Sequence, residues 1–513
     1  MPSQESQESQ KKKIYKIGTR GSLLALTQCN QVRVELERLT GDSFELDVIK
    51  TQGDLITNAP LWQLDGKDFF TKELDEALLT GRVDLVVHSY KDLGSVRPLG
   101  ITLAAVTKRT FAHDILLIKK STIEAIRDKN EFIIGTSSPR RMVNLEAGLK
   151  PFLPNASEDL RVTTKVLRGN VNTRIEKLIN DDYDAIVLAL PGIERLALTE
   201  SSRLELAKLL DGLSFMVLPQ SVFPSSASQG ALGIECLDSR TDNGELWAKL
   251  RKMQDENTAL EVQRERVAFN KYGGGCHLAV GINVKKIQDY FLHNHHGILE
   301  NEKVEFSLLE GRELPQLRPS PRVFTGHFPD DQLVLKKEVS ADLSGKNHLY
   351  VTSKHCMHAL KKAPESLWAA GIKSMKDLVN KGFWVNGTAD SLGDEEIHLL
   401  RSSKAIGLMI DTNATLFVLS NTEATTTLGE VIPCYRREVN TSLTDEFKNK
   451  INETEVFYWS SYPQYQMYLE YFPQIKNRYH ASGLGKTFNQ FKQHNIKTIP
   501  FAGMEEFKKW TKI

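Results

Sequence analysis

Short apolar runs alternate with amphipathic segments along the first half of the chain. Alternating apolar positions in "SFELDVIKT" (43–51) predict a half-buried strand. Three continuous apolar runs, at 84–89, 132–138 and 184–190, end in small or polar residues and are typical of buried strands in a parallel sheet. In open α/β sheets, ligand-binding groups lie beyond the carboxyl ends of such strands.

Helical spacing occurs between these runs. In residues 70–82, Leu74 and Leu78 share one face, and Gly81 is placed to end the helix in a left-handed conformation. Residues 171–181 show the same spacing. The first 235 residues or so are therefore predicted to form open, mostly parallel α/β sheets.

The pattern changes after Glu235. A charged helical segment (243–271) leads to a glycine-rich loop and then to two alternating, strand-like segments, which together predict a small α+β domain. We interpret "HNHH" (293–296) as a solvated polar turn, because no carboxylate or cysteine spacing supports a metal site there. An α/β pattern returns from about residue 347.

Composition and charge exclude several classes of protein. The 513 residues include 66 Lys and Arg and 65 Asp and Glu, for a net charge of +1, which argues against a dedicated nucleic-acid coat or a membrane-surface protein. The five cysteines are far apart without a CxxC pair, so we expect neither a disulfide framework nor a zinc site, and we expect reducing cytosol. The polar tail (1–13) is predicted to be disordered and not a signal peptide, and no apolar run is long enough to span a membrane.

The stretch "YGGGCHLAVG" (272–281) leads three glycines directly into Cys276. A free cysteine is most often a small buried hydrophobic residue. The glycines, however, have no side chains to pack and allow another group to approach the backbone closely. This pattern favours an accessible, functional thiol over a core residue.

Polar and cationic residues follow several of the predicted strands. "GTSSPRR" (135–141) and "LRGNVNTR" (167–174) combine side-chain polar groups and free backbone N–H groups with arginines. Other such residues are His88, Ser89, Lys91, Asp92, Arg20 and Arg195. Because each guanidinium can hold a carboxylate through two hydrogen bonds, arginines that recur at strand ends predict a cleft for several carboxylates.

Taken in order, these motifs resemble the porphobilinogen deaminase (hydroxymethylbilane synthase) family. The matching stretches, from residue 14 to about 285, are "GTRGSLLALTQ", "KTQGD", "KELDEALLTGRVDLVVHSYKD", "GTSSPRR", "LRGNVNTR", "DAIVLALPGIERL", "SQGALGIEC" and "GGGC". The resemblance implies two lobes like those of periplasmic binding proteins and a small α+β domain, here followed by a C-terminal α/β region. The implied division is a tail (1–13), domain 1 (14–107 and 217–238), domain 2 (108–216), domain 3 with the cysteine loop (239–345) and a further region (346–513).

The family joins four porphobilinogen units head to tail, with loss of ammonia at each step, on a covalent dipyrromethane primer. The resemblance implies that Cys276 holds this cofactor through a thioether and that Asp92 is the catalytic carboxylate. The residues implied to hold the cofactor are Cys276, Lys91, Ser138, Arg140, Arg141, Arg168, Asp54 and Ser89. Those implied to bind substrate are Arg20, Ser22, Thr136, Asn170, Arg174, Arg195, Lys67 and Phe70, the last two in a lid. No metal is implied.

Some loops depart from the family pattern. "KRTFAHDI" keeps only Arg109 and Asp114 of the family's loop, and Ala279 stands where the family has proline after the cysteine loop. These changes alter loop shape more than charge, and the cysteine, aspartate and arginines remain. We interpret them as divergence without loss of activity.

The C-terminal region resembles part of uroporphyrinogen-III synthase, in residues 416–439, 455–472 and 478–500. It is shorter than that two-domain family, so its first half is expected to be abbreviated. The resemblance implies a bifunctional enzyme that also cyclises its linear product to uroporphyrinogen III. Candidate residues there are Ser420, Asn421, Tyr435, Ser460, Ser461 and Thr487.

Three other interpretations remain open: a deaminase with a non-catalytic C-terminal domain, a polycarboxylate-binding module without catalysis, and a regulatory pseudoenzyme. A binding module needs neither Asp92 nor a thiol on a glycine loop, so these residues favour an enzyme. We expect a cytoplasmic monomer with porphobilinogen as its small-molecule substrate and with no nucleic-acid or membrane partner.

Overall fold

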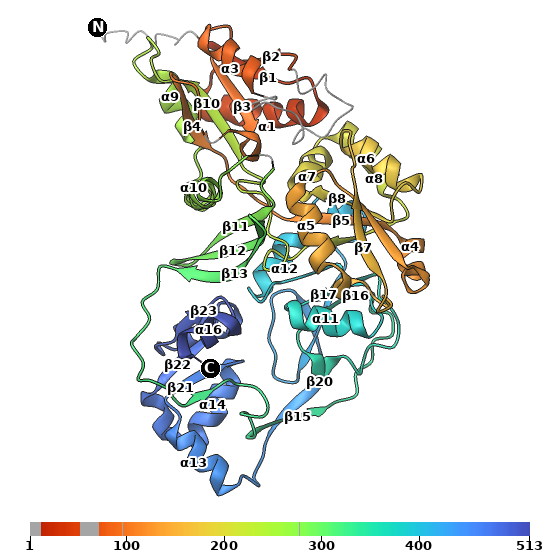
Figure 1. The fold of residues 1–513 in the computed structure, drawn as a ribbon, viewed down its shortest axis with the longest axis vertical. Helices are drawn as coiled ribbons and strands as arrows, with labels where there is room; N and C mark the ends of the chain where they lie inside the picture. Colours follow the sequence, from red (N-terminus) through yellow and green to blue (C-terminus); the bar gives the residue numbers. More distant parts are fainter. Residues whose placement is uncertain (1–11, 52–70, 95, 276, 513) are drawn as a thin grey trace, which may run out of the picture.

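The computed structural model describes residues 12–51, 71–94, 96–275 and 277–512, and Figure 1 shows their arrangement. Five β-sheets are formed within these ranges. Helices cover the larger sheets, so the predicted α/β class is confirmed. Four predicted site residues lie outside the described ranges: Asp54, Lys67, Phe70 and Cys276.

The first sheet forms domain 1. Its strands, in order across the sheet, are β2 (Ser43–Val48), β1 (Ile14–Thr19), β3 (Leu85–Ser89), β10 (Leu232–Leu237) and β4 (Ile101–Val106), and its helices are α1 (Leu23–Thr40), α3 (Lys72–Leu79) and α9 (Glu245–Leu250). Ile17, Leu36 and Leu246 form part of its buried core. The order of strands reverses between β1 and β3, so the carboxyl ends of these strands mark the expected ligand crevice.

The second sheet, similar in arrangement, forms domain 2. Its strands, in order, are β7 (Arg161–Lys165), β6 (Glu131–Gly135), β8 (Ala185–Ala189), β5 (Asp114–Lys119) and β9 (Leu213–Val217), and its helices are α4 (Lys120–Ala125), α5 (Pro139–Gly148), α6 (Val171–Ile179), α7 (Leu190–Leu198) and α8 (Glu200–Leu210). The order reverses between β6 and β8, which again marks a ligand crevice. The chain crosses between domains 1 and 2 through residues 107–113 and 218–231.

Domain 3 packs helix α10 (Glu256–Lys271) on an antiparallel sheet of β11 (Val280–Ile287), β12 (Tyr290–Leu299) and β13 (Glu302–Glu310). The interpretation of "HNHH" as a turn is wrong, because these residues lie in the middle strand, β12. His295 is buried against Phe306, and its Nδ1 atom is 2.8 Å from the Tyr272 hydroxyl. Contacts within the domain therefore bury a side chain that appears solvated in the sequence.

Residues 323–511 form two α/β lobes. The six-stranded lobe contains β15 (Val334–Glu338), β20 (Gly429–Val439), β19 (Leu416–Asn421), β16 (His348–Val351), β17 (Ser366–Ala369) and β18 (Gly387–Thr388), with α11 (Ile372–Asn380) and α12 (Asp394–Arg401). The four-stranded lobe contains β14 (Val323–Phe324), β21 (Val456–Trp459), β22 (Tyr479–Gly483) and β23 (Ile499–Phe501), with α13 (Asp445–Glu453), α14 (Tyr462–Tyr471), α15 (Lys486–Gln493) and α16 (Met504–Thr511). Sheet membership thus groups residues 323–338 with the C-terminal lobes, although the sequence placed them in domain 3.

The six-stranded lobe joins domain 2 edge to edge. The Val217 N–H of β9 donates to the carbonyl of Asn386, next to β18, and the Asn386 side chain donates to the Phe215 carbonyl (2.7 and 3.0 Å). Phe215 packs on Trp368 on one face of the combined sheet, and Met216 joins the core on the other face. Because both cores continue across this joint, domain 2 and the six-stranded lobe form one packed unit.

The four-stranded lobe joins domain 3, as the dark blue end of the chain below β13 shows in Figure 1. The Glu506 carboxylate of α16 accepts a hydrogen bond from the Leu309 N–H of β13 (3.0 Å) and pairs with Arg312. Leu309 and Leu484 share a small apolar cluster at this joint. The main joints of the two lobes are therefore with different domains of the N-terminal half, although Lys285 of β11 also pairs with Glu396 of α12.

Candidate functional site

Lys91 and Asp92 lie directly beyond β3, in the short helix η2 (Tyr90–Asp92). A hydrogen bond from the Tyr90 N–H to the Ala231 carbonyl (3.0 Å) holds this turn against the second crossing between the domains. The Asp92 side chain is exposed. Burial lowers the pKa of Lys91 to about 8, although the adjacent Asp92 acts in the opposite direction. An exposed carboxylate and an ammonium of lowered pKa therefore lie side by side at the predicted crevice.

The other predicted residues of domain 1 surround the same strand ends. Ser22 begins α1 and accepts a hydrogen bond from the Ala25 N–H (3.3 Å), as an N-cap residue does. Ser89 is hydrogen-bonded to Gln28 of α1 (2.9 Å). Arg20 follows β1, so the structure brings it to the end of the sheet that carries Ser89.

Arg140 and Arg141 of α5 share one buried carboxylate. Their Nη2 atoms lie 2.8 and 2.7 Å from the two oxygens of Asp114. Burial alone would raise the pKa of Asp114, but the two guanidinium groups hold it well below its ordinary value. Arg140 also donates to the Pro224 carbonyl (2.8 Å). These contacts fix both arginines in place, while their number of donors leaves others for a ligand.

The remaining candidates of domain 2 lie at neighbouring strand ends. Thr136 is buried, and its hydroxyl accepts from the Ser138 N–H (3.3 Å) just before α5. Asn170 caps α6 by accepting from the Thr173 N–H (2.9 Å). Caps and short turns of this kind hold the carboxyl-end loops of the sheet in a fixed shape.

A concentration of positive charge accompanies these loops. Burial, followed by the proximity of Arg141 and Arg168, lowers the pKa of Arg174 to about 10. Arg141 also opposes protonation of Lys91. The arginines of "GTSSPRR" and "LRGNVNTR" therefore lie near Lys91, and a site for carboxylates at this place stays a prediction.

Gln229 connects the two domains at this point. Its Oε1 atom accepts a hydrogen bond from Lys91 (3.1 Å), and its Nε2 atom donates to Asp114 (2.8 Å). A continuous network thus runs from Lys91 to Arg140 and Arg141. The sequence motif "SQGALGIEC" contains Gln229 but indicates no role for it. The partners of Gln229 lie more than one hundred residues away in the sequence, and no local pattern predicts them.

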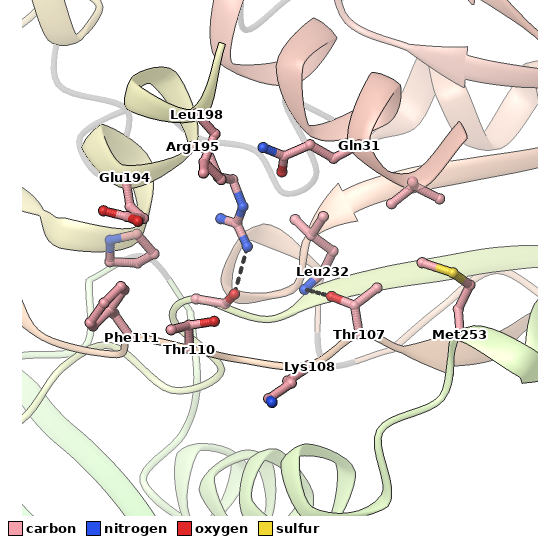
Figure 2. A pocket seen from close by; sticks show the side chains of 13 residues that line it. Gln31, Thr107, Lys108, Thr110, Phe111, Glu194, Arg195, Leu198, Leu232 and Met253 are labelled. Atoms are coloured by element: carbon pink, nitrogen blue, oxygen red, sulfur yellow. Dashed lines mark hydrogen bonds between the residues drawn. The ribbon is translucent and has the colours of Figure 1, made fainter. Parts of the chain in front are cut away.

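Arg195 lies apart from this network, beside a cavity of about 200 Å³ at the crossings between the domains. Figure 2 shows its guanidinium pointing to the Gly230 carbonyl, to which it donates (2.6 Å), while Gln31 reaches the cavity from α1. Gly230 has a φ of 93°, and a Cβ atom there would lie 2.0 Å from the Phe111 carbonyl oxygen, so only glycine fits. Burial lowers the pKa of Arg195 to about 10.

Domain 3 approaches the arginines of domain 2 through Gly281. A Cβ atom at Gly281 would lie 2.3 Å from the Pro224 carbonyl oxygen and 3.3 Å from the Cδ atom of Arg140. Arg109, in the first crossing, pairs with Glu265 of α10 (2.9 Å) and fixes domain 3 on the crossings. Cys276 precedes Gly281 by five residues in the sequence but lies outside the described residues.

A group of possible metal ligands, which the sequence did not indicate, lies inside domain 1. Ligand atoms of Asp75, His88 and Glu235 lie within 4.8 Å of one another. Arg97 pairs with both carboxylates (2.5 and 2.8 Å). Burial, with smaller contributions from Arg97 and Arg20, lowers the pKa of His88 to about 3. We interpret the group as a buried ion-pair network, because the guanidinium already pairs with both carboxylates.

The C-terminal candidates fall into two groups. In the six-stranded lobe, Ser420 and Asn421 end β19, and Tyr435 is buried in β20. In the four-stranded lobe, Ser460 and Ser461 follow β21, and Ser461 caps α14. The remaining candidate there is Thr487, whose hydroxyl donates to the Ser460 carbonyl (3.3 Å). Each group thus lies at carboxyl ends of parallel strands.

Paired α/β domains with cations and an exposed carboxylate at their strand ends are typical of the class of proteins that bind an anionic ligand between two domains. The chain belongs to the porphobilinogen deaminase family. The family model described as "Porphobilinogen deaminase, dipyromethane cofactor binding domain" matches residues 15–245. This description confirms the predicted cofactor.

Relatives named porphobilinogen deaminase support this membership. The one from a Nitratiruptor species is 37% identical over 53% of this chain and 79% of its own length. Those from Lachnospira eligens and Sulfurimonas denitrificans are 40% and 39% identical, and the matches cover 83% and 80% of their lengths. These matches span about half of this chain, so cyclisation by the C-terminal region stays a prediction. Among the described residues, no helix is long and apolar enough to cross a membrane.

Proposed function

We propose that this chain joins porphobilinogen units head to tail on a dipyrromethane primer held by Cys276, with Asp92 as the catalytic carboxylate. Family membership supports the overall reaction. The observation that carries the roles is the position of Asp92, which is exposed beside Lys91. Lys91 is in turn linked through Gln229 and Asp114 to the arginines of domain 2.

The residues present fit the cofactor. A dipyrromethane carries acidic side chains, and the donors at the strand ends are an ammonium and several guanidinium groups, which pair with carboxylates. Once bound, the cofactor supplies the pyrrole end on which the chain grows. Its proposed partners are Lys91, Ser89, Ser138, Arg140, Arg141 and Arg168, together with Asp54 outside the described residues.

The residues of this chain have distinct roles in the proposed reaction. Asp92 stabilises the positive charge that develops on the pyrrole nitrogen when ammonia leaves, and it accepts and returns a proton. Asp114 keeps Arg140 and Arg141 oriented through the contacts described above. The proposed substrate-binding residues are Arg20, Ser22, Thr136, Asn170, Arg174 and Arg195, with Lys67 and Phe70 as the lid.

The Cys276→Ser variant tests the primer attachment. We expect the purified protein to be heavier than its sequence by one dipyrromethane and the variant to have the mass of the sequence alone, because a serine hydroxyl does not form the thioether. Intact-mass spectrometry measures both, and Cys29→Ser is the matched control because Cys29 is buried. A variant that keeps the added mass would contradict the assignment.

A second function is favoured for the C-terminal region. Its two lobes carry polar side chains at the carboxyl ends of parallel strands, and the chain crosses between them after β14 and after β20. This arrangement supports the proposal that the region cyclises the linear product to uroporphyrinogen III. The proposed contributors are Ser420, Asn421, Tyr435, Ser460, Ser461 and Thr487.

The product isomer tests this second function. We expect the full chain to convert porphobilinogen mainly to the type III isomer, because a linear tetrapyrrole that leaves the protein closes spontaneously to type I. Chromatography of the oxidised products separates the two isomers. A product that is mostly type I would show that the C-terminal region is not a working synthase.

A further inference from the structure

The six-stranded lobe has its own reversal of strand order. After β16 the chain adds β17 and β18 on one side, and it then returns to add β19 and β20 on the other. The carboxyl ends of β16 and β19 therefore mark the place where open α/β sheets bind ligands. Thr352 and Ser420 follow or end these strands, and their hydroxyls are hydrogen-bonded (2.9 Å).

Cationic side chains converge on this place from four elements. Lys336 of β15 and Arg437 of β20 are cross-strand partners. Lys354 begins the short helix η6 (Lys354–Cys356), which contacts β15, β20 and α11. Lys373 lies in the first turn of α11. We call Lys336, Lys354, Lys373 and Arg437 the lysine–arginine cluster.

Few carboxylates balance the cluster. Asp331 approaches it, but its oxygens accept hydrogen bonds from Gln464 and Tyr468 of the four-stranded lobe (2.6 and 2.8 Å). Glu423 lies 3.7 Å from Arg437 and is otherwise exposed.

The lysines of the cluster lie close enough to affect the pKa of Lys336. Burial lowers the pKa of Lys336, Asp331 opposes this effect, and Arg437, Lys354 and Lys373 lower the pKa further. Among the described residues, these lysines make no ion pair within 4.0 Å. Mutually repelling lysines without ion pairs at a ligand-binding position are the features expected of a site for a polyanion.

We propose that the lysine–arginine cluster binds the carboxylates of a tetrapyrrole at the reversal of strand order in the six-stranded lobe. This inference rests on the proposed function, because the N-terminal half is then the source of a chain with many acetate and propionate groups. Arg437 supplies a planar pair of donors, the lysines supply charge, and the Thr352 and Ser420 hydroxyls supply neutral hydrogen-bonding groups. The ligand class is a polycarboxylate and not a single small anion, since the cations come from four separate elements.

Binding of porphyrins to the full-length holoenzyme tests the site. The probes are uroporphyrin I, an octacarboxylate, and coproporphyrin I, a tetracarboxylate, each titrated by fluorescence at low and high salt. We expect Lys354→Glu/Lys373→Glu to weaken binding of uroporphyrin I by at least about tenfold, because two attractive charges become repulsive. Lys361→Glu/Lys362→Glu, at exposed positions of the same lobe, changes the net charge equally and should bind as the parent does.

Three outcomes would overturn the inference. The first is an equal loss of uroporphyrin I affinity in both double variants, and the second is equal affinity of the parent for uroporphyrin I and coproporphyrin I. The third is displacement of bound porphyrin by millimolar inorganic phosphate at constant ionic strength. Porphobilinogen consumption should stay unchanged in both double variants, which shows that the deaminase half is folded.

Failure of the site and failure of cyclisation are distinguishable. Loss of porphyrin binding without a change in product isomer contradicts a role in cyclisation, whereas type I product with intact, cluster-dependent binding leaves the site standing and contradicts the synthase.

Discussion

The Asp92→Asn variant is expected to turn over porphobilinogen about 100- to 10,000-fold more slowly, while its fold and its bound primer stay in place. Asparagine has nearly the same shape as aspartate, but it neither carries the charge nor exchanges the proton that the reaction requires. Because Asp92 is exposed and lies beyond a strand end, the domain core does not depend on it. The measurement is the steady-state rate of porphobilinogen consumption, together with the intact mass of the variant.

Asp211→Asn is a suitable control, since Asp211 is an exposed carboxylate at the end of α8 in domain 2. It should leave both the rate and the mass unchanged. Turnover by Asp92→Asn within a few-fold of the parent rate would remove Asp92 from the catalytic role. Loss of the added mass in this variant would instead assign Asp92 to primer assembly.

The Trp368→Ala variant is expected to lose about 3–5 kcal/mol of unfolding free energy, because a fully buried indole is replaced by a cavity. Trp368 has an exposed fraction of 0% and packs on Phe215 of domain 2 at a ring-centroid distance of 6.0 Å. The loss should therefore destabilise domain 2 together with the six-stranded lobe. Urea unfolding followed by circular dichroism measures the first effect, and the temperature of half-inactivation of the deaminase measures the second.

Two comparisons sharpen this test. The indole nitrogen of Trp368 has no hydrogen-bond partner in the described structure, so Trp368→Phe should cost less than the alanine variant. Trp247→Ala removes a partly exposed ring that stacks with Arg251 and should cost less than about 1 kcal/mol. If Trp368→Ala unfolds the lobe but leaves the thermal inactivation of the deaminase unchanged, the two units are not energetically joined.

The pattern of apolar residues located the strands of domains 1 and 2 closely. The run at 84–89 is β3 (Leu85–Ser89), and the run at 184–190 contains β8 (Ala185–Ala189). Because a buried strand is short, apolar and followed by polar residues, sequence alone also located Lys91 and Asp92 at a strand end. Local sequence carries this information, since both the strand and the loop after it are contiguous.

Partners distant in sequence could not be predicted in the same way. The arginines of "GTSSPRR" were expected to be available to a ligand, yet Arg140 and Arg141 already share Asp114, which lies on another strand. The histidines at 293–296 are polar, and only the neighbouring strands show that β12 is central. Likewise, Phe215 and Trp368 are plainly apolar, but no local pattern indicates that they pack on each other across two sheets.

The two joints of the C-terminal lobes have a mechanical consequence. The six-stranded lobe is fastened to domain 2 through β9 and β18, and the four-stranded lobe is fastened to domain 3 through Glu506. The two lobes also contact each other, since Lys486 of α15 donates to the Thr425 carbonyl. A rotation of domain 3 against domain 2 would therefore break contacts in at least one of these joints. Because Lys285 of β11 also pairs with Glu396 of α12, the C-terminal half restrains domain 3 from both of its lobes.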